Sequence, residues 1–141
     1  MLFVGEFQHT LDAKNRIFIP AKYRDSLGEN FYIACKMNSP CLAIYTEADM
    51  EGFVRKLEAF PDSEVAAINQ ALFSMAAQVT PDGSGRIVLL PHMLEYAGIQ
   101  KNVMVIGAGS HLQIWSEEYW KKEISNRNMQ QIRSQLASVG L

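Results

Sequence analysis

Cysteine and histidine are scarce in this chain, and their scarcity excludes whole classes of protein. The 141 residues include two cysteines, Cys35 and Cys41, and three histidines. Two cysteines cannot form a disulfide framework, and no histidine lies at zinc-ligand spacing from either of them. We therefore expect both cysteines to be buried as small hydrophobic residues, and we expect no bound metal and no cofactor.

Long apolar runs are missing as well. The longest aliphatic stretches, such as residues 87–90, are far below membrane-spanning length, and the start of the chain has no basic segment followed by an apolar run. These absences predict a protein of the cytoplasm that has no membrane partner.

The chain also lacks an excess of positive charge. Lys and Arg number 13 against 15 Asp and Glu, so the net charge is −2. This balance argues against a protein that coats nucleic acid through bulk charge. The charges are unevenly spread, however, because residues 12–24 carry four basic side chains and one acidic, whereas residues 47–64 carry six acidic and two basic. One end of the chain is therefore basic and the other acidic.

An internal repeat is the most informative feature that the sequence does contain. A shift of 70 positions (82 minus 12) aligns the two halves without a gap. A unit this short struggles to bury its own apolar face, so we expect two copies to pack about a pseudo-twofold axis into one core. The identities pair Thr10, Asp12, Arg16, Ile17, Gly28, Leu42, Ile44 and Glu47 with Thr80, Asp82, Arg86, Ile87, Gly98, Leu112, Ile114 and Glu117.

The pattern predicts one domain over residues 1–141, with copies at about 1–58 and 75–125. Each copy is expected to run strand, turn, strand, short helix, hairpin and longer helix, and Thr46 and Ser116 are expected to cap the longer helices. A connector helix is expected at about 62–74. A C-terminal helix is expected at about 117–138, with apolar residues spaced by three and four near its end, either docked on a neighbour or frayed.

Two turns share one pattern, in which Asp and Arg are separated by three small or polar residues: Asp12 to Arg16 and Asp82 to Arg86. An Asp that opens a tight turn accepts backbone N–H bonds two residues on. The position before Arg favours a positive φ, which Gly85 reaches freely. The Arg is then held at a fixed angle, and its rigid fork of donors fits phosphate oxygens or the edge of guanine.

The same residues also allow a purely structural interpretation. An Asp and an Arg four residues apart can form an ion pair that only fixes the connection between two strands, and a duplicated fold duplicates its structural turns. The flanking Lys14, Lys22 and Arg24 favour binding of an anion by the first copy. At the matching positions the second copy has Ser84, His92 and Leu94.

Four stretches of the sequence resemble the MraZ family: Thr10-Leu11-Asp12-Ala13-Lys14-Asn15-Arg16, Ile19-Pro20-Ala21-Lys22-Tyr23-Arg24, Asp82 to Arg86, and Leu112-Gln113-Ile114-Trp115. The resemblance covers nearly the whole chain. It implies an α+β fold similar to the AbrB and SpoVT regulators and the antitoxin MazE. That fold is a small double-split β-barrel of two pseudo-twofold repeats with peripheral helices.

The resemblance also implies a function. The chain would be a sequence-specific transcriptional regulator that binds double-stranded DNA as a ring-like homo-oligomer, on direct repeats upstream of its own division and cell-wall gene cluster, in association with the nucleoid. Arg86 would contact either DNA or a neighbouring subunit. The resemblance implies DNA binding by Arg16, Lys14 and Arg86, with the turns supported by Asp12 and Asp82. From the residues themselves we expect Asn15, Lys22 and Arg24 to join the DNA contact and Gly85 to support the second turn.

Two other function classes are weighed against this one. The first is a protein-interaction module similar to AbrB and MazE, whose main partner is another protein and whose acidic residues 47–64 form the contact. The second is an enzyme. Its nearest candidate residues, Ser84, His92 and Asp82, match no triad motif, so we expect no catalytic site and no small-molecule substrate.

Overall fold

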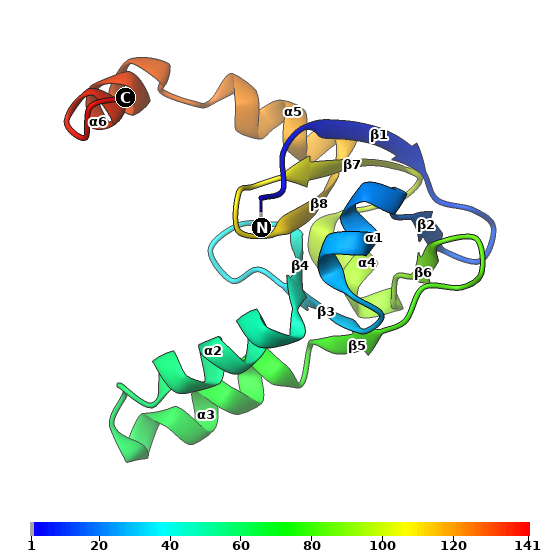
Figure 1. Cartoon of the computed structure of the whole chain (residues 1–141), viewed down its shortest axis with the longest axis horizontal. Helices are drawn as coiled ribbons and strands as arrows, with labels where there is room; N and C mark the ends of the chain where they lie inside the picture. The colour runs from blue at the N-terminus through cyan, green and yellow to red at the C-terminus, as the bar shows by residue number, and fades with distance from the viewer. Residues whose placement is uncertain (1) are drawn as a thin grey trace.

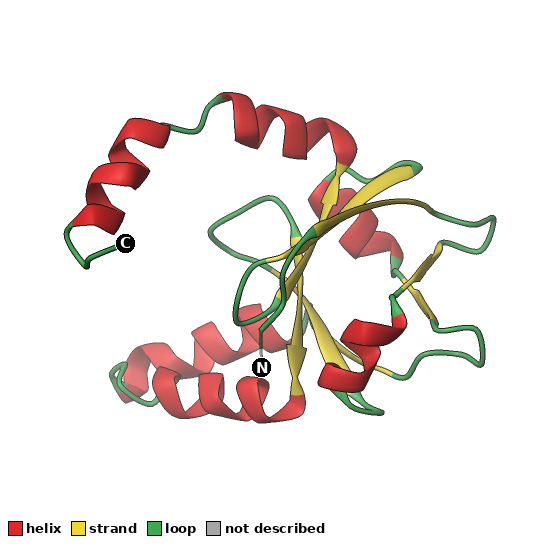
Figure 2. Ribbon diagram, turned by 45° about the horizontal axis from the view of Figure 1, so that its top comes forward, coloured by secondary structure: helices red, strands yellow, loops and turns green. Residues whose placement is uncertain are grey.

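A computed structural model of the chain describes residues 2–141 and shows an α+β fold (Figures 1 and 2). This class is the one the sequence predicts; Met1, the first residue of the expected first copy, lies outside the described residues. The first half contains β1 (Glu6–Thr10), β2 (Arg16–Phe18), α1 (Ala21–Leu27), β3 (Phe31–Cys35), β4 (Leu42–Thr46), α2 (Glu47–Leu57) and α3 (Asp62–Phe73). The second half contains β5 (Ala77–Val79), β6 (Arg86–Val88), α4 (Pro91–Ala97), β7 (Asn102–Gly107), β8 (Leu112–Ser116), α5 (Glu117–Ser125) and α6 (Met129–Ala137).

The strands of the two halves are interleaved. Six of them form an antiparallel sheet in the order β1-β7-β8-β4-β3-β5, and β2 pairs with β6 in a separate ribbon. Exchanging each strand for its counterpart in the other half gives the same order, counted from the opposite edge, so the halves are related by a pseudo-twofold axis. Within residues 2–141, β1 and β5 are edge strands, and the six-stranded sheet is open rather than closed into a barrel.

The strand register corrects the gap-free alignment at one element. Phe31 of β3 pairs with Thr46, but it is Val103 of β7, and not Lys101, that pairs with Ser116. β7 therefore lies 72 positions (103 minus 31) after β3, because the link before it is two residues longer and the hairpin loop after it is two residues shorter. A shift of two residues keeps every side chain on its own face of the sheet, so the burial pattern survives the change.

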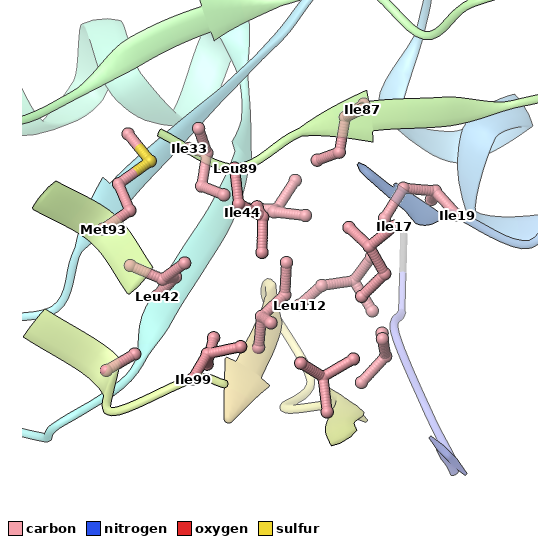
Figure 3. Packing of buried hydrophobic residues seen from close by; sticks show 14 of the residues in the cluster. Ile17, Ile19, Ile33, Leu42, Ile44, Ile87, Leu89, Met93, Ile99 and Leu112 are labelled. Atoms are coloured by element: carbon pink, nitrogen blue, oxygen red, sulfur yellow. The ribbon is translucent and has the colours of Figure 1, made fainter. Parts of the chain in front are cut away.

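One hydrophobic core fills the space between the sheet, the β2–β6 ribbon and the short helices α1 and α4. Figure 3 shows Ile17 and Ile87 of the ribbon region pointing into the same cluster as Ile44 and Leu112 of the central strands. All four side chains are at most 2% exposed. Both copies therefore contribute to the larger of the two buried clusters, as the short length of each copy led us to expect.

Two helical arms project from this body on the same side in Figures 1 and 2. We call them the α2–α3 arm and the α5–α6 arm. The β2–β6 ribbon and the turns that lead into it lie at the opposite end of the molecule. Over residues 2–141, none of the helices combines the length and the apolar character needed to cross a bilayer.

The C-terminal helix expected at about 117–138 is divided in the structure, where α5 and α6 are separate helices. α5 ends at Ser125, and Asn128 begins a new helix by accepting a hydrogen bond from the backbone N–H of Gln131 at 3.0 Å. Asn is among the residues that most favour this capping position. The polar segment 126–128 therefore stops the first helix and starts the second.

Candidate nucleic-acid interface

The β2–β6 ribbon places the two Asp–Arg turns side by side. We call residues 12–16 turn 1 and residues 82–86 turn 2. In the ribbon Arg16 lies opposite Val88, and Phe18 lies opposite Arg86. Since the two strands are antiparallel and related by the pseudo-twofold axis, both turns meet at one end of the molecule (Figure 1).

In turn 1 the carboxylate of Asp12 organises the whole turn. One oxygen, Oδ1, accepts the backbone N–H groups of Lys14 and Arg16, both at 2.9 Å. The other, Oδ2, accepts the side-chain Nε–H of Arg16 at 2.7 Å. The turn therefore fixes the direction in which the Arg16 side chain leaves the backbone.

Turn 2 repeats this arrangement. Oδ1 of Asp82 accepts the backbone N–H groups of Ser84 at 2.9 Å and Arg86 at 3.0 Å, and Oδ2 accepts Nε–H of Arg86 at 3.1 Å. The backbone N–H of Arg86 is the main cause that lowers the pKa of the Asp82 carboxyl, and that of Arg16 lowers the pKa of Asp12 in the same way. Both carboxyls are therefore ionised at neutral pH.

The residue before each Arg has the left-handed backbone that the sequence predicts. Asn15 has φ of 58° and Gly85 has φ of 82°. This conformation lets each carbonyl reach across to the other half: the Asn15 carbonyl accepts the N–H of Leu89, and the Gly85 carbonyl accepts the N–H of Ile19, both at 2.9 Å. The turns therefore tie the two copies together as well as holding their own arginines.

Ion pairs also run between the turns. Nη1 of Arg86 lies 3.4 Å from Oδ2 of Asp12, and Nη1 of Arg16 lies 3.8 Å from Oδ2 of Asp82. We call these four residues the Asp–Arg quartet. The ion pair of the structural interpretation is therefore present, and it extends across the pseudo-twofold axis. The Arg16 and Arg86 side chains nevertheless remain 25% and 35% exposed.

Arg24 lies on turn 2 rather than on turn 1. Its Nε–H donates to the carbonyl of Ile19 at 2.9 Å. Its guanidinium lies over the ring of Phe18, with Cζ 5.7 Å from the ring centroid. A Cβ atom placed on Gly85 would lie only 2.6 Å from Cζ of Arg24. The guanidinium of the first copy thus covers the glycine of the second copy's turn.

The other predicted cations are more peripheral. Lys14 and Asn15 are exposed at the tip of turn 1. Lys22 is exposed on α1, where its Nζ lies 4.5 Å from the ring centroid of Phe7 and 4.9 Å from that of Tyr23. The structure therefore gathers the quartet, Gly85 and Arg24 into one cluster, whereas Lys14 is exposed at the tip of turn 1 and Lys22 lies over Phe7 and Tyr23.

Exposed apolar side chains beside the quartet are a feature that the sequence analysis missed. Phe18 is 39% exposed, Val88 is 49% exposed and Leu90 is 38% exposed. The signal was present in the alternation that runs through β2 to the residue after it, because Ile17 and Ile19 are buried and Phe18 between them is exposed. This end of the molecule therefore combines charged and apolar surface.

His92 and the two cysteines make contacts of their own in the structure. Nε2 of His92 lies 3.1 Å from the carbonyl oxygen of Met75. Cys35 and Cys41 are free and buried, and burial raises the pKa of the Cys41 thiol to about 12. Among residues 2–141, the side chains of His, Cys, Asp and Glu do not gather in threes that could hold a metal ion.

Comparison with known proteins finds one family. The family model described as "MraZ protein, putative antitoxin-like" matches residues 2–70 and 72–137, so its two matches follow the two copies. Three relatives named "Transcriptional regulator MraZ" come from Dictyoglomus thermophilum, Symbiobacterium thermophilum and Acetivibrio thermocellus. That name describes a regulatory role and not an enzymatic one.

These relatives are similar over most of their length. The Dictyoglomus protein is 39% identical, over 98% of this chain and 98% of its own. The Symbiobacterium protein is 43% identical, over 83% of this chain and 86% of its own. The Acetivibrio protein is 34% identical, over 99% of this chain and 100% of its own. Since the family model spans both copies and the relatives match most of the chain at 34–43% identity, the chain belongs to the MraZ family.

Proposed function

We propose that this chain is a sequence-specific DNA-binding transcriptional regulator. It acts as a ring-like homo-oligomer on direct repeats upstream of its own division and cell-wall gene cluster, in the cytoplasm and in association with the nucleoid. The name of the relatives supports the regulatory role. The proposal includes the double-split β-barrel fold of the AbrB and MazE proteins, which the pseudo-twofold order of the strands supports.

The observation that carries the DNA contact is the way turn 1 holds Arg16. An Arg side chain has five N–H donors, and the bond from Nε to Asp12 uses one of them. Because Asp12 sets the direction of a side chain that is still 25% exposed, Arg16 keeps donors for a phosphate oxygen or for the O6 and N7 edge of guanine. A guanidinium held in this way loses less conformational freedom on binding than a free one.

The neighbouring cations have supporting roles in this proposal. Lys14 and Asn15 at the exposed tip of turn 1, with Lys22 on α1, contact the phosphate backbone and set the orientation of the protein. Arg24 and Arg86, both partly engaged within the molecule, complete the cationic end.

Self-association follows from the small number of cations. One protomer presents only a few basic side chains, whereas about 6–10 phosphate contacts give strong, salt-dependent binding. A ring would present the same turn several times, and linked sites gain roughly 10²–10⁴ in avidity without new contacts. The helical arms lie at the end opposite the turns, which leaves the turns free for DNA in an assembly built through the arms.

The test is a fluorescence-anisotropy titration with the DNA that precedes the gene. Arg16→Ala is expected to weaken binding about 5- to 150-fold, the loss that follows from about 1–3 kcal/mol for one bidentate contact. Arg16→Lys keeps the positive charge but loses the bidentate guanidinium. Its affinity for the DNA is expected to lie between that of Arg16→Ala and that of the wild type. The matched control is Arg55→Ala, which removes an exposed Arg from the α2–α3 arm. A folded, assembled Arg16→Ala protein with unchanged affinity would contradict the proposal.

A second candidate function is a module that binds another protein through the α2–α3 arm. The arm projects from the body, and residues 47–64 carry six acidic and two basic side chains. Retention on heparin or operator DNA that falls steeply with salt favours DNA binding. Capture of a protein partner that is insensitive to salt favours the second candidate.

A further inference from the structure

We propose that α6 of one protomer docks in an apolar groove beside the α2–α3 arm of a second copy, so that the copies join head to tail. This inference rests on the self-association in the proposed function and names the surfaces that would produce it. It does not depend on the contact with DNA.

Within residues 2–141, the apolar face of α6 is left largely uncovered. Met129, Ile132 and Leu136 lie on one side of the helix, at spacings of three and four. Met129 and Leu136 are 44% and 43% exposed, and from residue 121 to residue 141 only Ile132 is even half-buried. Isolated helices shorter than about 12–15 residues are marginal in water, so a helix of nine residues needs a surface to pack on.

The difference between the two copies explains why α6 does not fold back as α3 does. In the first copy α3 runs back along α2, where Phe53 and Leu57 are apolar (Figures 1 and 2). In the second copy the matching residues, 70 positions later, are Glu123 and Arg127. The guanidinium of Arg127 lies 5.5 Å from the ring of Trp120 and covers the small apolar cluster there. The surface of α5 therefore lacks the apolar side chains on which α6 could pack as α3 packs on α2.

The first copy has an open groove that suits such a helix. The groove has a volume of about 400 Å³ and lies between the α2–α3 arm and the β3–β4 hairpin. Its apolar lining includes Met37, Tyr45, Phe53, Leu57, Leu72 and Phe73. A groove of this kind binds the i, i+3 and i+7 side chains of an amphipathic helix, which is the pattern that Met129, Ile132 and Leu136 present.

Charge favours α6 of a second copy as the occupant. The segment 47–64 has a net charge of −4, from six acidic and two basic side chains. Residues 126–141 contain two arginines and neither Asp nor Glu. The two charged side chains that line the groove itself, Lys36 and Lys56, are basic, so the acidic side chains of 47–64 act from elsewhere on the arm and not from the groove lining. Opposite net charge on the two segments steers such partners together.

The contact is heterologous, since it joins two different surfaces. Repeated contacts of this type close into rings when the rotation between neighbours allows it. Both surfaces lie at the end of the molecule opposite the Asp–Arg turns, so the turns stay accessible in the assembly.

The test uses the full chain and sedimentation velocity over a range of concentrations. The wild type is expected to form oligomers, and Ile132→Asp with Leu136→Asp is expected to give the 15.9 kDa monomer. The control, Gln130→Asp with Ser134→Asp, adds the same charge to the opposite face of α6 and is expected to assemble as the wild type does. Because residues 121–141 lie outside the core, circular dichroism should show the same folded body in all three proteins.

Variants of the groove complete the test. Leu72→Glu and Met37→Glu each place a charge in the groove lining. Met37 is a loop residue that is already 49% exposed, so Met37→Glu should leave the fold intact. Each groove variant alone is expected to be monomeric. Mixed with the α6 variant, it is expected to give a dimer of twice 15.9 kDa and nothing larger, since only one intact pair of surfaces remains.

Three outcomes would overturn the inference. Assembly of the α6 variant would show that the helix is not the contact, and assembly of both groove variants would point to pairing of α6 with α6 or to another partner surface. A monomeric wild type would overturn both this contact and the ring, and the Arg16→Ala titration would still judge the DNA contact separately.

Discussion

At the scale of single residues, Arg24 of the first copy lies where a side chain at position 85 of the second copy would begin. The two turns match closely, yet turn 1 has Asn15 where turn 2 has Gly85, although both positions have positive φ. Gly85 lies beneath the guanidinium of Arg24, whereas the residue that matches Arg24 in the second copy is Leu94. The difference between the turns therefore follows from packing across the pseudo-twofold axis and not from the backbone of the turn alone.

This packing predicts that Gly85→Asn destabilises the fold even though Asn is accepted in turn 1. We expect a loss of about 1–3 kcal/mol in the free energy of unfolding, because the left-handed backbone strains a residue with a Cβ and because the new Cβ displaces the flexible end of Arg24 from the Ile19 carbonyl and the Phe18 ring. Adding Arg24→Leu, which reproduces the pairing of the other turn, should restore part of the loss. Urea unfolding followed by circular dichroism measures both effects.

The control for this substitution is Gly83→Asn, since a Cβ at position 83 meets no atom within 4 Å. Equal stability of Gly85→Asn and the wild type, or a double variant no more stable than the single one, would show that Arg24 does not set the constraint.

The carboxylates of the quartet predict how stability depends on pH. The folded state lowers the pKa of Asp12 and Asp82 below the ordinary value of 3.8, so each contributes stability above that value and loses it as the pH falls through the lower, folded pKa. Asp12→Asn together with Asp82→Asn should flatten the decline of the unfolding free energy below about pH 4. Urea titrations at a series of pH values measure the slope, and an unchanged slope in the double variant would contradict the prediction.

At the scale of elements, local chemistry was enough to locate most helices and strands. The expected N-caps are confirmed: the hydroxyl of Thr46 accepts the N–H of Asp49 at 3.1 Å, and that of Ser116 accepts the N–H of Tyr119 at 3.0 Å. The bonds from Asp12 and Asp82 to their own turns were predictable for the same reason, since each joins groups within four residues of one another.

The two-residue register shift of β7 and the break between α5 and α6 could not be predicted as reliably. A slide of two residues leaves the inward and outward pattern unchanged, so periodicity gives no sign of it. The break at 126–128 depends on a cap by Asn128 within a segment whose apolar spacing continues on both sides. Both features lie where the repeat pattern is compatible with more than one register.

The contacts between the two turns could not be predicted from the sequence, for a different reason. The ion pair between Arg86 and Asp12 joins residues 74 positions apart, and the position of Arg24 over Gly85 also depends on how the copies pack. The sequence singled out the residues that the structure gathers into the cluster of the quartet, Gly85 and Arg24. It could not show that two of the guanidinium groups are partly engaged by carboxylates of the other copy.

At the scale of the whole molecule, neither copy has a complete sheet of its own. β1 pairs with β7, β3 with β5, β2 with β6 and β4 with β8, so every strand of one copy needs a strand of the other. The core likewise draws on both copies. The folded unit therefore consists of two copies, whether they lie in one chain or in two.

This organisation predicts the behaviour of a chain divided at the loop between α2 and α3. Fragments 2–60 and 61–141, expressed separately, should not form folded monomers, because each would leave its strand edges and apolar face uncovered. Mixing them should restore a cooperative thermal transition by circular dichroism, with sizing that corresponds to one of each. Self-pairing of one fragment would also satisfy the expectation, whereas a folded monomer of either fragment would contradict it.

The interleaved strands also constrain how far the two halves can diverge. A side chain gained by one half occupies space beside the other half, as Arg24 does above Gly85. Substitutions that look independent in the sequence, 61 positions apart (85 minus 24), are therefore neighbours in space. Engineering of either half alone should proceed in matched pairs of positions drawn from both halves.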